Sequence, residues 1–141
     1  MTLTQKYKYG LNDHPVNVAF IIQIGLWLLA VGLPYALEWV TIYGPSYNFH
    51  RSVMSMEAWG WLFVIGGIAT LASLFIRNPV IKFAARSVPS VIIMVWTVLW
   101  YVAAFIPGFP GWSAVPTYTF IALTSILTFY SPAIARRWSN E

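Results

Sequence analysis

Four long apolar runs, each almost free of charged side chains, limit what this chain can fold into. They span residues 16–37, 57–76, 88–106 and 113–130. A helix that crosses a bilayer needs about 20 mainly apolar residues, because each residue advances about 1.5 Å across a hydrocarbon layer of about 30 Å. The sequence therefore predicts an all-α fold, a polytopic integral membrane protein with a bundle of four transmembrane helices.

The composition excludes the main classes of soluble protein. Of the 141 residues, 59% are apolar and only 9% are charged, and the mean hydropathy is +0.68. Soluble domains are about 45–50% apolar and about 25% charged, so this chain cannot cover a surface that faces water. Its basic residues lie between the apolar runs and form no basic face, which excludes nucleic acid as a partner. We expect one transmembrane domain over residues 1–141.

Proline and capping residues suggest where the predicted helices begin and end. Ser55 can cap the second helix, and the pair Asn78-Pro79 is expected to stop it. Ser87 and Pro89 are expected to open the third helix, because proline is tolerated in a first helical turn. The sequence contains no cysteine, which excludes disulfides and thiol chemistry.

The basic residues predict the orientation in the membrane. Only Arg51 falls on one side of the predicted spans. Seven others fall on the opposite side: Lys6, Lys8, Arg77, Lys82, Arg86, Arg136 and Arg137. Basic residues are retained in the cytoplasm, so both ends are predicted to lie inside, with cytoplasmic tails at 1–15 and 131–141 and an outer loop at 38–56. The predicted location is the bacterial cytoplasmic membrane.

The first two spans each carry a face of small or weakly polar residues. Gly25 and Gly32 share a face of the first span, and Gly66, Thr70 and Ser73 share a face of the second. In lipid, small residues let helix backbones approach, and hydroxyl groups bond between helices. We therefore interpret these faces as contacts between helices or between copies of the chain, with a wet path as the alternative.

The fourth span carries a hydroxyl face, and the first carries a deep carboxamide. Thr117, Thr124 and Thr128 are candidates for a polar lining. Gln23 needs a hydrogen-bonding partner in hydrocarbon, which either another helix or a second copy can supply. No acid, lysine or arginine lies in the middle of a predicted span, and this absence argues against a proton-coupled transporter.

The predicted outer loop and its edges hold a small group of charged residues. It consists of Glu38, His50, Arg51 and Glu57. The group is expected to be an interfacial cluster that orders the loop, with a metal or acid–base site as the alternative. No H-x-x-x-H or H-E-x-x-H spacing is present, so we predict no metal, no cofactor and no enzyme activity.

Residues 57–67, EAWGWLFVIGG, and the Arg136-Arg137 tail carry a family resemblance. In these features, in span count and in short loops, the chain resembles small four-span membrane proteins of actinobacteria and their phages, some of which are holins. The resemblance implies a self-associating protein that accumulates silently and then permeabilises the membrane. Many holins have more highly charged tails than this chain. The alternatives are an accessory subunit of a larger bacterial membrane complex and a small-solute transporter or channel unit.

Overall fold

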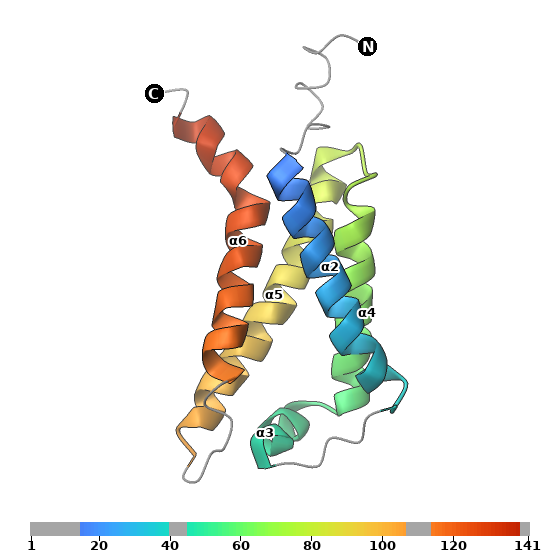
Figure 1. The fold of residues 1–141 in the computed structure, drawn as a ribbon, viewed down its shortest axis with the longest axis vertical. Helices are drawn as coiled ribbons and strands as arrows, with labels where there is room; N and C mark the ends of the chain where they lie inside the picture. Colours follow the sequence, from blue (N-terminus) through green and yellow to red (C-terminus); the bar gives the residue numbers. More distant parts are fainter. Residues whose placement is uncertain (1–14, 40–44, 107–113, 139–141) are drawn as a thin grey trace.

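The computed structural model describes residues 15–39, 45–106 and 114–138, and these residues form helices and short connections. No strand occurs in these three ranges. The fold of the described chain is therefore all-α (Figure 1). Its helices are α2 (Pro15–Ala36), α3 (Pro45–Val53), α4 (Met56–Ala72), α5 (Pro79–Ala104) and α6 (Ala114–Trp138).

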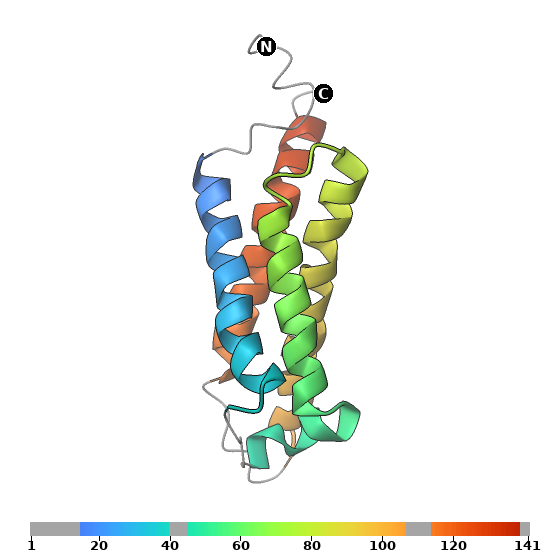
Figure 2. The same cartoon turned by 90° about the vertical axis from the view of Figure 1, so that its right-hand side faces the viewer.

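Four of these helices form an antiparallel bundle, and the short α3 lies across one end of it (Figures 1 and 2). The start of α2, the end of α6 and the connection between α4 and α5 lie at the other end. Helix α2 contacts α4 and α6, and α5 also contacts α4 and α6. Helices α2 and α5 are therefore diagonal in the bundle.

Two helices of the described chain are long and apolar enough to cross a bilayer. They are the Asn17–Ala36 part of α2 and the whole of α5. A third candidate arises if α3 and α4, which are bent by 83° at the break between them, count as one span. Helix α6 is apolar over the shorter stretch Ala114–Leu127. These helices have the composition of a helical membrane protein.

The start of α5 differs from the sequence prediction. Asn78 does not stop the preceding helix but caps α5, because its Oδ1 accepts hydrogen bonds from the backbone N–H groups of Val80 at 2.9 Å and Ile81 at 3.4 Å. Pro79 then occupies the first turn, where its missing N–H costs no hydrogen bond, because N–H groups in the first turn have no acceptor within the helix. The expectation that Ser87 and Pro89 open this helix was wrong, since both lie inside α5.

Helix α4 begins as the sequence predicts and ends earlier. Ser55 caps it, with its Oγ accepting a hydrogen bond from the N–H of Ala58 at 3.2 Å. The helix ends at Ala72, four residues short of the predicted boundary at Ile76. The predicted outer loop also contains the helix α3. The sequence analysis did not predict this helix, because its residues are polar and aromatic and include no long apolar run.

Glycines bring the backbones of α2 and α4 into direct contact. A Cβ atom added at Gly32 would lie 2.9 Å from the carbonyl oxygen of Gly60, and one added at Gly25 would lie 3.4 Å from that of Gly67. Both pairs fit one antiparallel register. Gly25 and Gly32, which the sequence analysis grouped on one face, lie in this contact. Gly60 and Gly67 are their partners on α4.

Hydroxyl groups join α5 to α6. The Oγ atoms of Ser90 and Ser125 lie 3.0 Å apart and share a hydrogen bond. Thr97 Oγ1 lies 3.3 Å from the carbonyl oxygen of Tyr118 and also donates to its own helix at Ile93. Hydrogen bonds of this kind between helices contribute about 1 kcal/mol in lipid. Together they set the register of the two helices.

We predict that Gly60→Ala destabilises the bundle, whereas Gly66→Ala does not. A Cβ at Gly60 would meet the backbones of Tyr35 and Ala36, so α2 and α4 must separate at a cost of about 1–3 kcal/mol. A Cβ at Gly66 would meet its nearest atoms, in Ile92 and Pro89, at 3.6 Å, which is an ordinary contact. Unfolding of both variants in detergent micelles measures the difference, and equal stabilities would contradict the close α2–α4 contact.

Candidate functional site

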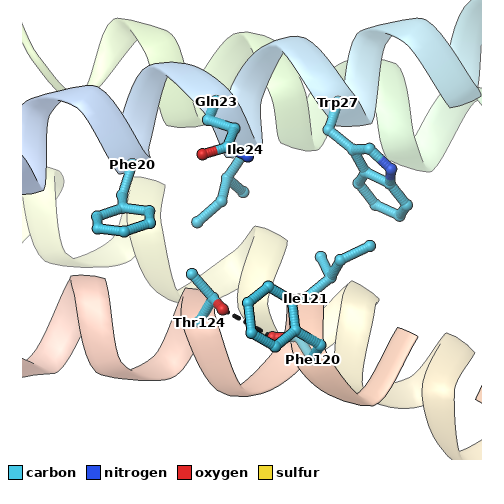
Figure 3. A pocket seen from close by; sticks show the side chains of 7 residues that line it. All are labelled: Phe20, Gln23, Ile24, Trp27, Phe120, Ile121 and Thr124. Carbon is cyan, nitrogen blue, oxygen red and sulfur yellow. Dashed lines mark hydrogen bonds between the residues drawn. The ribbon is translucent and has the colours of Figure 1, made fainter. Parts of the chain in front are cut away.

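A pocket of about 100 Å³ lies between α2 and α6 (Figure 3). Its walls are mostly apolar and aromatic, with one carboxamide and one hydroxyl group. Seven residues line it: Phe20, Gln23, Ile24, Trp27, Phe120, Ile121 and Thr124. It therefore brings together two residues that the sequence analysis assigned to different roles, Gln23 as a contact and Thr124 as a lining residue.

The Gln23 side chain carries the strongest unmet demand for hydrogen bonds at this pocket. Gln23 lies on the exposed surface of α2, about 5 Å along the helix axis from the middle of the Asn17–Ala36 stretch. Among the residues that the structure describes, none hydrogen-bonds to its carboxamide. A carboxamide can donate two hydrogen bonds and accept two, so Gln23 is equipped to bind a partner outside its own chain.

Thr124 lies on the opposite wall of the pocket, on α6 (Figure 3). Its Oγ1 donates a hydrogen bond of 2.8 Å to the carbonyl oxygen of Phe120 in the preceding turn. The hydroxyl proton is therefore in use, and the oxygen retains the capacity to accept. Thr124 can thus complement a donor but not a second acceptor.

The other α6 hydroxyls do not enclose a channel in the described part of the bundle. Thr117 is exposed, and the side chain of Thr128 lies outside the described residues. The interior next to α6 is filled by buried side chains, including Phe63, Trp96 and Trp100. A polar path along the α6 face would therefore have to lie outside a single bundle, for example between two copies of the chain.

The hydroxyls of the α4 face bond within their own helix and to one cation. Thr70 Oγ1 donates to the carbonyl oxygen of Gly66 at 2.8 Å, and Ser73 Oγ donates to that of Thr70 at 2.6 Å. Ser73 Oγ also accepts a hydrogen bond of 3.1 Å from Nε of Arg86 on α5. Gly66 itself faces Pro89 on α5. This face therefore joins α4 to α5.

Arg86 is a functional candidate that the sequence analysis missed. It was assigned to a cytoplasmic connection, because the third span was expected to start at Val88. It lies instead within α5, with only 7% of its surface exposed. Helix α5 therefore carries Arg86 in its N-terminal part, ahead of the predicted span, whereas residues 88–104 contain no acid, lysine or arginine. The capping pair Asn78-Pro79 was the signal for a longer helix.

The four outer-loop residues lie in different environments. Glu38 follows α2 with a backbone φ of 55°, Glu57 lies in the first turn of α4, and both are exposed. Arg51 is partly exposed in α3, whereas His50 beside it is fully buried. Within the described ranges, no group of three His, Cys, Asp or Glu residues could hold a metal ion.

His50 fixes α3 to the bundle through aromatic contacts. Its ring centroid lies 4.3 Å from that of Trp96 and 4.8 Å from that of Trp100, both on α5. The indole Nε1 of Trp59 on α4 donates a 3.2 Å hydrogen bond to the His50 carbonyl oxygen. No sequence spacing signals this cluster, because its members come together only when α3 folds back on the bundle.

We predict that His50→Ala releases α3, whereas Ser52→Ala does not. Loss of the imidazole leaves a cavity beside Trp96 and Trp100, which should lower the free energy of unfolding by about 2–4 kcal/mol. Ser52 is exposed, and its hydroxyl donates a local hydrogen bond to the Phe49 carbonyl oxygen. Hydrogen exchange in micelles should show faster exchange of the α3 amides in His50→Ala alone. Unchanged exchange would mean that His50 does not hold α3.

Comparisons with known proteins find no match for this chain. No protein-family model matches it, no curated protein matches it, and no solved structure matches it. The function is therefore inferred from the chain's own side chains and their arrangement.

Proposed function

We propose that this chain is a four-span protein of the bacterial cytoplasmic membrane that self-associates and permeabilises the membrane, as holins do. The observation that carries the proposal is the Gln23 carboxamide, which lies on the surface of a candidate span and has no hydrogen-bonding partner among the described residues. The proposal adds α4 and α6 to the spanning set and keeps both chain ends inside.

The energetics of a carboxamide in hydrocarbon favour association. An amide without a hydrogen bond costs roughly 2–7 kcal/mol in an apolar medium, so Gln23 gains from any polar partner in the membrane. Measured hydrogen bonds between membrane helices contribute only about 0.6–2 kcal/mol, because the separated state also finds partners. Gln23 therefore selects the contact face, and packing of the surrounding apolar side chains must supply the remaining affinity.

The route of permeation in this proposal runs between copies. Aromatic side chains fill the bundle beside α6, so one copy offers no wide polar passage in its described part. Thr117 and Thr124 lie on α6, and Thr124 borders the pocket that holds Gln23. Copies that associate around this region would bring their α6 hydroxyls together, which suits contact with water.

Two alternatives draw on the same structure. An accessory subunit would use the Gln23 face to bind a different membrane protein. A small-solute transporter or channel unit would use Arg86, since a charged residue inside a candidate span is a marker of function in membranes. Expression of this chain alone distinguishes the first proposal from both alternatives, because only the holin-like protein is expected to permeabilise the membrane abruptly after a lag.

The topology predicts opposite labelling at the two ends of the bundle. The chain has no cysteine, so a single introduced thiol reports its own side of the membrane. Ser52 on α3 and Phe75 between α4 and α5 are both exposed, and they lie at opposite ends. In intact cells, a membrane-impermeant maleimide should label Ser52→Cys and should label Phe75→Cys only after lysis. The reverse pattern would invert the orientation.

The permeabilising activity predicts a lag followed by abrupt dye entry. The chain is expressed alone in a bacterium, with an impermeant dye and optical density followed over time. Gln23→Leu should delay or abolish dye entry, because it removes the carboxamide while raising the apolarity of the span. Ile22→Leu is the matched control, since Ile22 is exposed on the same helix and is already apolar.

Healthy growth with well-inserted protein would contradict the holin-like proposal. It would favour the accessory subunit, which needs its partner to act. Equal lag times for Gln23→Leu and Ile22→Leu would remove Gln23 from the mechanism while leaving the activity itself intact.

A further inference from the structure

The face formed by α2 and α6 has a knob beside a hole. The hole is the pocket of about 100 Å³ between the two helices. The knob is Phe120 on α6, whose side chain lines the pocket edge and is 70% exposed. A cavity of about 150 Å³ can hold a benzene ring, so this hole is of the size order of an aromatic side chain. A face with both features can pack against a copy of itself.

Symmetry limits what Gln23 can meet in such a pair. Two copies inserted with the same orientation are related by an axis along the membrane normal, and rotation about that axis leaves each residue at its own depth. Gln23 can then reach only groups at its own level on the second copy. The polar groups there, within the described pocket, are Gln23 and Thr124.

The chemistry of these two side chains selects the pairing. A carboxamide both donates and accepts, so two Gln23 side chains can exchange a pair of hydrogen bonds across a two-fold axis. Thr124 already donates to Phe120, and its oxygen can accept from any carboxamide N–H that remains. A lipid acyl chain has no donor or acceptor and would leave Gln23 unsatisfied.

We infer that α2 and α6 form a two-fold seam between two copies of this chain. In this seam the Gln23 carboxamides hydrogen-bond to each other, and Phe120 of each copy enters the pocket of the other. The inference rests on the proposed self-association, and it specifies the face and the partner residues through which association occurs.

A cysteine on the Gln23 side of α2, about two helical turns away, tests the seam without removing the carboxamide. Ala30 is exposed on α2, and seven residues from Gln23 it lies on nearly the same side of the helix. Because the chain has no cysteine, Ala30→Cys is the only thiol in that variant. The carboxamide and the pocket residues stay unchanged.

Val98→Cys on α5 is the matched control. Val98 is exposed, and α5 is diagonal to α2 in the bundle. The Trp27 ring contacts Tyr118, and Thr97 bonds to the Tyr118 carbonyl, so Val98 and Ala30 lie within about one helical turn of the same depth. The two thiols therefore differ mainly in which face of the bundle they occupy.

Oxidative cross-linking in native membranes should join two copies through Ala30→Cys and not through Val98→Cys. Adding Gln23→Leu to Ala30→Cys should lower the cross-linked fraction at least several-fold, and adding Phe120→Ala should lower it as well. Gln23→Leu makes the span more apolar, so a lower yield does not reflect failed insertion. Adding Ile22→Leu instead should leave the yield unchanged.

Other results would overturn the seam. Three results would place the association on another face and leave the proposed self-association standing. They are cross-linking through Val98→Cys alone, equal yields at both positions, and a yield through Ala30→Cys that Gln23→Leu does not change. Absence of cross-linking at both positions would also reject the seam. Single-molecule photobleaching of a labelled chain then decides whether self-association itself fails, because single bleaching steps throughout would mean that the chain is monomeric.

Discussion

The close contact between the α2 and α4 backbones is the constraint on which the rest of the bundle depends. Gly25 and Gly32 meet α4 along one side of α2: a Cβ at Gly32 would clash with the α4 backbone at 2.9 Å, and one at Gly25 would clash with the Leu71 side chain at 2.6 Å. At about 100° per residue, Gln23 lies roughly 180–200° from both glycines around the helix. Packing the glycine side against α4 therefore leaves Gln23 at the opposite, open side, next to α6.

The remaining contacts include hydroxyl hydrogen bonds toward the α4–α5 connection and an aromatic cluster toward the end where α3 lies. Ser90 and Ser125 join α5 to α6, and Ser73 receives Arg86 between α4 and α5. At the other end, rings on α3, α4 and α5 pack around His50. The Ser73, Arg86, Ser90 and Ser125 side chains are buried inside the bundle, whereas the Gln23 carboxamide lies at the surface pocket. The α2–α6 face is therefore the surface through which we propose that copies associate.

Some features follow from local sequence and were predicted without a structure. The helical class follows from long apolar runs, and Ser55 at the start of α4 follows from its ability to accept a backbone N–H. The local sequence did not predict the helix boundary correctly where one motif is compatible with two structures. Asn78-Pro79 can end one helix or begin the next, and the choice depends on whether residues 79–87 find a surface to pack against. In the structure Arg86 packs against Ser73, which favours the longer α5.

By itself, the sequence determined that the chain is helical, apolar enough for membranes and free of cysteine chemistry, because these properties depend on composition and on runs of neighbouring residues. It also placed Gln23 deep in an apolar helix. Only the tertiary structure decided that Gly60 and Gly67 meet the glycines of α2, that His50 is buried between two indoles, and that Gln23 shares a pocket with Thr124. Those pairings join residues far apart in the chain, and they exist only because helix packing selects one rotation and one register for each helix.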